Sequence, residues 1–105
     1  MLLANWVISV SKSIMQDQKE CYITHSTLEL HKHHIFYGTA NRKKSEKWGC
    51  WVWLTAEYHN MSDHGVHFDK ALDLQLKQEC QRRFEELRGH DAFMMVFHRN
   101  YLEVD

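Results

Sequence analysis

The residues of this chain best suited to chemistry are its nine histidines. Six of them gather in two short stretches, which hold His31, His33 and His34, then His59, His64 and His67. Imidazole titrates near neutral pH and is the commonest nitrogen ligand of transition metals. A solvated histidine-rich turn is the simpler alternative, but the return of histidines later in the chain favours a metal or catalytic site.

His33 and His34 precede the apolar pair Ile35 and Phe36, which is typical of a strand. Neighbouring side chains on a strand point to opposite faces of the sheet. The two histidines can therefore serve one site only if the strand twists or ends near them. One ring would then face a metal ion and the other a substrate.

A basic stretch follows the first histidine cluster and contains Arg42, Lys43, Lys44 and Lys47. Such a run is usually a solvated face, but beside the histidines a loop that contacts phosphate is an equal alternative. The formal net charge of the chain is −1, so any attraction to nucleic acid must come from a local patch.

The length and composition predict one globular domain, and the strands and helices expected below make its class α+β. The 105 residues are 44% hydrophobic and 26% charged, an ordinary balance for a folded chain. Cys21, Cys50 and Cys80 are widely spaced and form no CxxC pair, so neither a disulfide framework nor a complete structural zinc site is predicted, and a reducing cytoplasm is expected. The apolar start of the chain, residues 1–8, is too short to span a bilayer and predicts a first strand or an extension, with no membrane partner.

The first two thirds of the chain predict a hairpin and a short helix. A strand over 28–36 and an aromatic strand over 50–54 would pair across a long basic loop. Residues 21–24 predict a short strand or knuckle. Residues 55–61 predict one or two helical turns with Thr55 as N-cap, and Gly65 should end them.

The last third predicts two helices that pack on each other. Asp69 is a suitable N-cap for a helix over most of 69–88, and Gly89 is a suitable stop. The apolar stripe of this helix comprises Leu72, Leu76, Cys80, Phe84 and Leu87. A second short helix should start at Asp91 and contribute Phe93, Met94 and Phe97 to the core, followed by a tail with Tyr101 and Leu102 as anchors.

A strand, a loop, a strand and a short helix, with histidines on the first strand and on the helix, resemble the ββα-metal layout of HNH (His-Asn-His) endonucleases. The chain is more closely similar to small HNH-like proteins of phages and prophages of Gram-positive bacteria. The similarity extends from residue 12 to 102, in ordered blocks at 12–16, 33–36, 40–43, 59–62, 65–68 and 99–102. It implies an N-terminal extension over 1–20, an HNH-like core over 21–68 and a C-terminal helical segment over 69–105, within one compact domain.

The resemblance also implies roles for individual residues. His33 and His59 would ligate one divalent ion (Mg, Mn, Zn or Ni), with His67, Asp63 or His64 as the third ligand. His34 would be the general base that activates water, with one ring nitrogen held by a backbone group and the other open to a cleft. The basic residues that would hold the phosphate are Arg42, Lys43 and Lys44.

The chain departs from the family pattern at two points: the two CxxC pairs that hold a structural zinc, and the central asparagine. Cys21 lacks its partner, since Thr24 stands there, and the second zinc pair is replaced by Thr55 and Tyr58. Packing of aromatic residues should brace the core instead: Trp48, Trp51, Trp53 and Tyr58. The central asparagine would fall near Gly49 or Cys50, and Asn41 is its possible substitute.

Two functions from different classes follow from this pattern. The first is a metal-dependent DNA endonuclease or nickase in the cytoplasm of a bacterial host. The second is a catalytically degenerate phage protein that inhibits a host defence nuclease by direct contact, as an anti-CRISPR protein does. The intact histidines favour the first. The lost zinc pairs and the absent asparagine favour the second, and exposed tryptophans would supply its contact surface.

Overall fold

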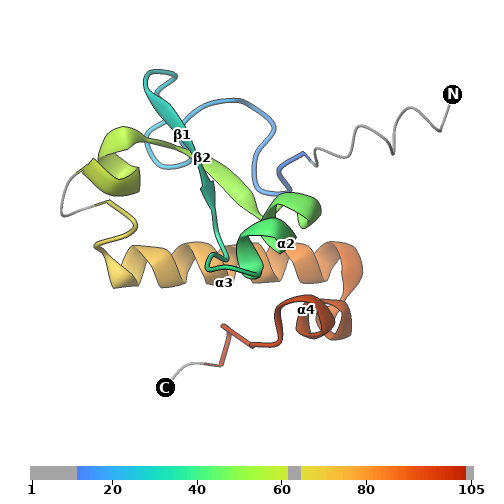
Figure 1. The fold of residues 1–105 in the computed structure, drawn as a ribbon. Coiled ribbons are helices and arrows are strands. Elements are labelled where there is room, and N and C mark those ends of the chain that lie inside the picture. Colours follow the sequence, from blue (N-terminus) through green and yellow to red (C-terminus); the bar gives the residue numbers. More distant parts are fainter. Residues whose placement is uncertain (1–11, 62–64, 104–105) are drawn as a thin grey trace, which may run out of the picture.

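The structure, a computed structural model, describes residues 12–61 and 65–103 and confirms the α+β class. Its elements, in chain order, are β1 (Leu30–His34), α2 (Asn41–Trp48), β2 (Trp51–Thr55), the π-helical turn η1 (Glu57–Met61), α3 (Lys70–Arg88) and α4 (His90–Phe97). In the view of Figure 1 the β1–β2 hairpin lies above α3, and α4 lies below it. The strand or extension predicted for residues 1–10 lies outside the described residues.

The two predicted strands are present and pair antiparallel, although β1 is shorter than the predicted span of 28–36. The register places His33 opposite Val52 and His34 opposite Trp51. Directly opposed side chains share a face, and the face alternates along each strand. His33 and Val52 therefore face the core, where both are buried, while His34 and Trp51 lie on the other face.

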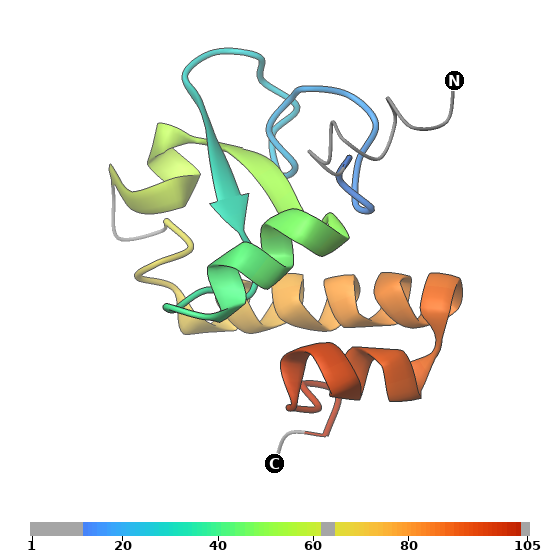
Figure 2. The same ribbon diagram turned by 45° about the vertical axis from the view of Figure 1, so that its right-hand side comes forward.

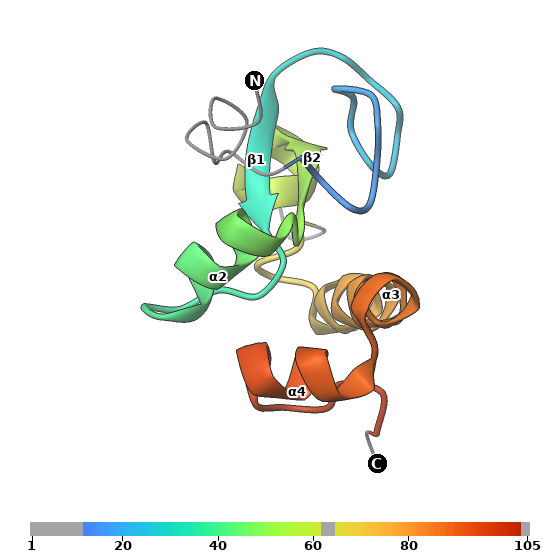
Figure 3. The same cartoon turned by 90° about the vertical axis from the view of Figure 1, so that its right-hand side faces the viewer.

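The predicted loop over 37–47 is wrong, because residues 41–48 form the helix α2. Lysine, arginine and glutamate are good helix formers, so the basic run that resembled a loop is a solvated helix face. Gly49 ends α2 with a positive φ of 74°, where a Cβ would lie only 2.3 Å from the Lys12 carbonyl oxygen. Ser45 fixes α2 to the end of β1, since its buried hydroxyl donates to the Phe36 carbonyl (2.6 Å) and accepts from the Phe36 N–H (3.1 Å). Figures 2 and 3 show α2 between the hairpin and α4.

Two details near the hairpin are confirmed in part. Residues 21–24 form a turn, which fits the predicted knuckle and not the predicted strand, and the Tyr22 N–H donates to the Trp53 carbonyl of β2 (2.8 Å). Thr55 is the last residue of β2 and pairs with Leu30. The predicted helical turns follow it directly, since Ala56 is helical and η1 covers Glu57–Met61.

The predicted long helix α3 is confirmed, with Asp69 as its N-cap. The Asp69 carboxylate accepts hydrogen bonds from the N–H groups of Ala71 and Leu72. The apolar stripe is buried from Leu76 to Phe84, and Leu72 packs partly against the core. Leu87 departs from the prediction because it is 51% exposed, in the last turn of α3.

The C-terminal part closes the core from the other side of α3. The helix α4 starts at His90, one residue before the predicted start, after Gly89 with a φ of 91°. Phe93, Phe97 and Tyr101 pack around Phe36, as the aromatic pattern predicts. None of the described helices has the length and apolar character needed to cross a membrane.

Candidate metal centre and its cavity

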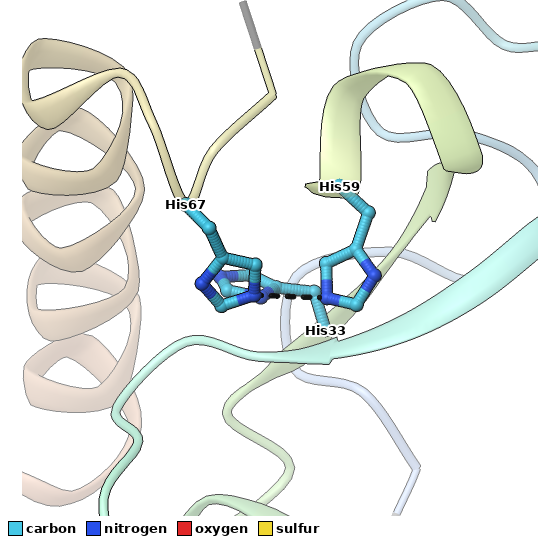
Figure 4. Close-up of side chains that lie close together, drawn as sticks. All are labelled: His33, His59 and His67. Atoms are coloured by element: carbon cyan, nitrogen blue, oxygen red, sulfur yellow. Dashed lines mark hydrogen bonds between the residues drawn. The ribbon is translucent and has the colours of Figure 1, made fainter. Parts of the chain in front are cut away.

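Three imidazole rings from different segments converge on one point. His33 comes from β1, His59 from η1 and His67 from the segment before α3, and Figure 4 shows their rings turned toward one another. One ligand atom from each lies within 4.8 Å of the other two. Within residues 12–61 and 65–103, no other group of histidines, cysteines or carboxylates is arranged in this way. The other two expected third ligands, Asp63 and His64, lie outside the described residues.

Gly65 brings His67 to His59. A Cβ at Gly65 would lie 3.1 Å from the carbonyl oxygens of Glu57 and His59, so a side chain there would push the segment away from η1. The close approach allows the Val66 N–H to donate to the Tyr58 carbonyl (2.6 Å) and the His67 N–H to the His59 carbonyl (3.3 Å). The glycine was predicted to end a helix, but η1 already ends at Met61, and close packing explains this glycine better.

The spacing of the nitrogen atoms suits a shared ion. Two nitrogens bound to one ion at about 2.0–2.1 Å each lie roughly 3–3.5 Å apart. The Nε2 atoms of His59 and His67 are 3.1 Å apart. His33 is 2% exposed, and its Nε2 has no hydrogen-bond partner among the described residues. A buried nitrogen without a partner is costly, and a metal ion would satisfy it.

Burial also holds two of the rings in the neutral form that ligates metals. Burial, together with the neighbouring His59 and His67, lowers the pKa of His33 to about 3. Burial lowers the pKa of His59 to about 4, again with help from His67. Both imidazole rings are therefore uncharged at neutral pH, so a metal ion can bind them without first displacing a proton.

The three rings form part of the wall of a cavity of about 410 Å³. The cavity is lined by Lys32, His33, His34, Tyr37, Arg42, His59, Asn60 and His67. No described carboxylate lines it, whereas the basic side chains of Lys32 and Arg42 do, so the cavity favours an anionic ligand.

The structure separates the three predicted phosphate-binding residues. Arg42, in the first turn of α2, lines the cavity. Lys43 is exposed and is not part of the cavity wall. Lys44 points elsewhere, since its ammonium donates to the Val96 carbonyl at 2.7 Å and so ties α2 to α4. Of the three predicted residues, only Arg42 lies beside the histidines.

His34 lies beside the metal centre on the other face of β1 and lines the same cavity. Its Nε2 is 2.8 Å from Glu46 Oε1, so its partner is a carboxylate and not the expected backbone group. The Lys32 ammonium donates to the same carboxylate at 3.2 Å. Burial alone would raise the pKa of Glu46, but the hydrogen bonds from His34 and Lys32 lower it. Glu46 thus stays ionised and orients the His34 ring.

Sequence reasoning assigned no role to three residues of the site, Lys32, Glu46 and His31. Glu46 was hidden because residues 37–47 were predicted as a loop, which gives no spacing from which to place its carboxylate. His31 Nδ1 lies 3.1 Å from His59 Nδ1. The signal for His31 was present, since it stands two residues before His33 on a strand and therefore shares its face. Asn41, the expected substitute for the central asparagine, is not part of the cavity wall.

The predicted aromatic brace is confirmed for two of its four residues. Trp48 and Tyr58 pack against the core, whereas Trp51 and Trp53 contact each other edge to face on the outer face of the hairpin. Trp51 is only 7% exposed, and Trp48 and Trp53 are half-buried. The described tryptophans therefore do not form the exposed surface expected of an inhibitor.

Comparison of the chain with protein-family models, with curated proteins and with solved structures gave no significant match.

Proposed function

We propose that this chain is a divalent-metal-dependent phosphodiesterase with an HNH-like ββα-metal site, acting as a DNA endonuclease or nickase in a bacterial cytoplasm. One observation carries the proposal. The buried, unpartnered Nε2 of His33 belongs to a group of three imidazoles in the wall of a cavity that also holds His34 and Arg42. A metal ligand set, a general base and a cation for phosphate are thus within one cavity.

The donor set favours a transition metal over magnesium. Imidazole nitrogen suits zinc, nickel and copper, whereas Mg²⁺ prefers oxygen ligands and a shell of water. The described wall of the cavity offers three imidazoles and no carboxylate. When bound, a divalent ion would supply Lewis-acid stabilisation of the charge that develops on the phosphate and on the leaving oxygen. We therefore expect zinc or nickel to support activity better than magnesium or manganese.

His34 would act as the general base through Nδ1. In the neutral ring that a general base requires, an Nε2–H that donates to the Glu46 carboxylate leaves the lone pair on Nδ1. A water oxygen attacks phosphorus while its proton passes to Nδ1, and the ester P–O bond to the leaving oxygen breaks. The leaving oxygen takes a proton from solvent, which gives a phosphomonoester and an alcohol. A positioned base of this kind contributes roughly 10²–10⁴-fold in rate.

Arg42 and Lys32 would hold the phosphate during the attack. Both are basic side chains that line the cavity. The Lys32 ammonium is partly engaged, because it donates to Glu46 and lies 4.1 Å from the centre of the Trp51 ring. Arg42 is exposed, and we assign it the main contact with phosphate oxygens.

A cleavage assay with a metal panel tests the proposal. Supercoiled plasmid is incubated with the purified chain in EDTA, Mg²⁺, Mn²⁺, Zn²⁺ or Ni²⁺, and zinc affinity is measured in parallel. We expect the variant His34→Ala to lose at least 10²-fold in rate while it keeps zinc affinity and folding. His33→Ala should lose both cleavage and zinc. His90→Ala, a change at an exposed histidine on α4, is the matched control and should change neither.

The same experiment decides between the two predicted classes. A wild-type chain that binds zinc but cleaves neither plasmid nor single-stranded DNA with any of the metals would contradict the nuclease proposal. Partner capture would then be the assay for the inhibitor function. A chain that binds none of the metals would contradict the metal centre itself.

A further inference from the structure

His31 stands behind the metal centre, in contact with one of its proposed ligands. Its Nδ1 is 3.1 Å from the Nδ1 of His59, and the two rings meet edge to face with centroids 5.3 Å apart. The opposite nitrogen of His59, Nε2, is the one that lies 3.1 Å from His67. His59 is therefore held between two imidazoles, one at each ring nitrogen.

The chemistry of ligation fixes where the protons of His59 must be. A neutral imidazole carries one proton, so a ring that ligates through Nε2 carries its proton on Nδ1. In this fold His59 Nδ1–H can donate to His31 Nδ1, provided that His31 carries its own proton on Nε2. The reverse arrangement, with the proton of His59 on Nε2, would block the lone pair that faces His67.

We propose that His31 is a positioning residue that accepts the Nδ1–H of His59 and so holds His59 in the tautomer that ligates metal through Nε2. The inference rests on the metal centre of the proposed function. A metal-bound histidine usually donates its second N–H to a carboxylate or a backbone carbonyl, and here another imidazole takes that place.

The same geometry excludes His31 from the ligand set. His31 contacts the side of the His59 ring that faces away from His67, so it cannot share the ion bound between Nε2 of His59 and Nε2 of His67. The group then supplies three protein ligands. Catalytic zinc sites have three protein ligands and keep one position for water or substrate, whereas structural sites have four. His31 would thus strengthen the centre without closing it.

The strand explains why His31 can act in this way. His31 and His33 are two residues apart on β1, so both lie on the face that carries Val52 and Leu54. The backbone of β1 therefore holds a ligand, His33, and the partner of a second ligand at a fixed separation. Replacement of His31 should alter the centre without removing any ligand.

Two substitutions separate the hydrogen bond from the bulk of the ring. His31→Asn keeps an acceptor, because the asparagine Oδ1 occupies nearly the place of the histidine Nδ1. His31→Leu has similar bulk and no acceptor. Zinc affinity is measured by competition with a chelator, Co²⁺ absorption spectra report ligand geometry, and thermal unfolding in EDTA reports the fold. We expect His31→Leu to bind zinc roughly 10–100-fold more weakly, His31→Asn to remain within about threefold of wild type, and all three to unfold alike in EDTA.

Long-range ¹H–¹⁵N NMR spectra of the zinc-loaded wild type add a test that needs no variant. They should show His59 protonated at Nδ1 and ligated at Nε2. Equal zinc affinity of His31→Leu and wild type, an equal loss in both variants, or ligation of His59 through Nδ1 would each overturn the inference. A wild-type chain that binds no zinc would overturn it together with the metal centre. Absence of cleavage by a chain that shows the expected zinc affinities would contradict the proposed function alone.

Discussion

The variant His33→Leu should stabilise the metal-free protein, which is unusual for a change at a buried position. His33 is 2% exposed, and its Nε2 has no hydrogen-bond partner. A buried polar group without a partner costs about 1–3 kcal/mol, and leucine removes that cost at similar volume. Imperfect shape subtracts up to about 1.5 kcal/mol. We therefore expect a net gain of about 1 kcal/mol in the free energy of unfolding, or roughly 4–8 °C in Tm for a domain of this size.

Metal should reverse the order of the two proteins. A ligand present at 100 times its Kd stabilises the folded state by about 2.7 kcal/mol. Wild type gains this stabilisation and His33→Leu, without one of the three ligands, gains little of it. In zinc, wild type should therefore be the more stable protein by about 1–2 kcal/mol. Thermal unfolding in EDTA and in zinc, followed by circular dichroism, measures both differences.

Gln81 offers the matched control, because it is buried and fully bonded. Its side chain donates to Asn100 (2.7 Å) and to Glu85 (2.8 Å) and accepts from the Tyr101 N–H (2.8 Å). Gln81→Leu should lower stability by about 1–3 kcal/mol, equally with and without zinc. A lower Tm of His33→Leu than of wild type in EDTA would refute the reasoning. His33 would then be a core residue whose polar atoms are satisfied without a metal ion.

Three further predictions follow from the cavity. Glu46→Gln should slow cleavage by roughly 10-fold or more without loss of zinc affinity, because the carboxylate orients His34; equal rates would show that the contact is structural only. Arg42→Ala should reduce kcat/KM by about 10²-fold, and Lys43→Ala, the neighbouring cation outside the cavity wall, should stay within about threefold. Metal-free protein should lose stability as the pH falls from about 6.5 toward 4, because the folded-state pKa of His33 is held near 3 and the unfolded chain binds the proton first; chemical denaturation at several pH values measures the slope, which should be smaller in His33→Leu.

The elements with a strong local signal could be predicted from the sequence. The aromatic and β-branched run around Trp51 gave a strand, and Asp69, the apolar steps and Gly89 gave α3 with its N-cap and its stop. The helix α2 could not be predicted, because a run of basic residues is equally typical of a solvated helix and of a loop. Its helical form depends on tertiary contacts, such as the buried hydroxyl of Ser45 on the Phe36 backbone.

The histidines of the candidate site could be predicted because one residue type repeats along the chain. The residues that contact these histidines from other elements could not be predicted. His33, His59 and His67 stood out by chemistry, and the structure brings their rings together. Glu46 is one of many carboxylates in the chain, and only the position of α2 singles it out. His31 belongs to the first histidine cluster of the sequence. Its proposed role depends on which nitrogen of His59 it contacts, and the spacing of residues does not determine that contact.

The charge of the cavity wall would make the proposed binding of metal and phosphate interdependent. The described wall holds Arg42 and Lys32 and no carboxylate, and of these two cations Lys32 is paired with Glu46. A divalent ion would therefore enter against the repulsion of Arg42 above all, and a phosphate that arrives beside it would cancel that repulsion. By thermodynamic linkage, each ligand must raise the affinity for the other by the same factor. Zinc titrations with and without inorganic phosphate measure this factor. The centre would hold its ion weakly while empty of substrate and tightly once an anion is in place.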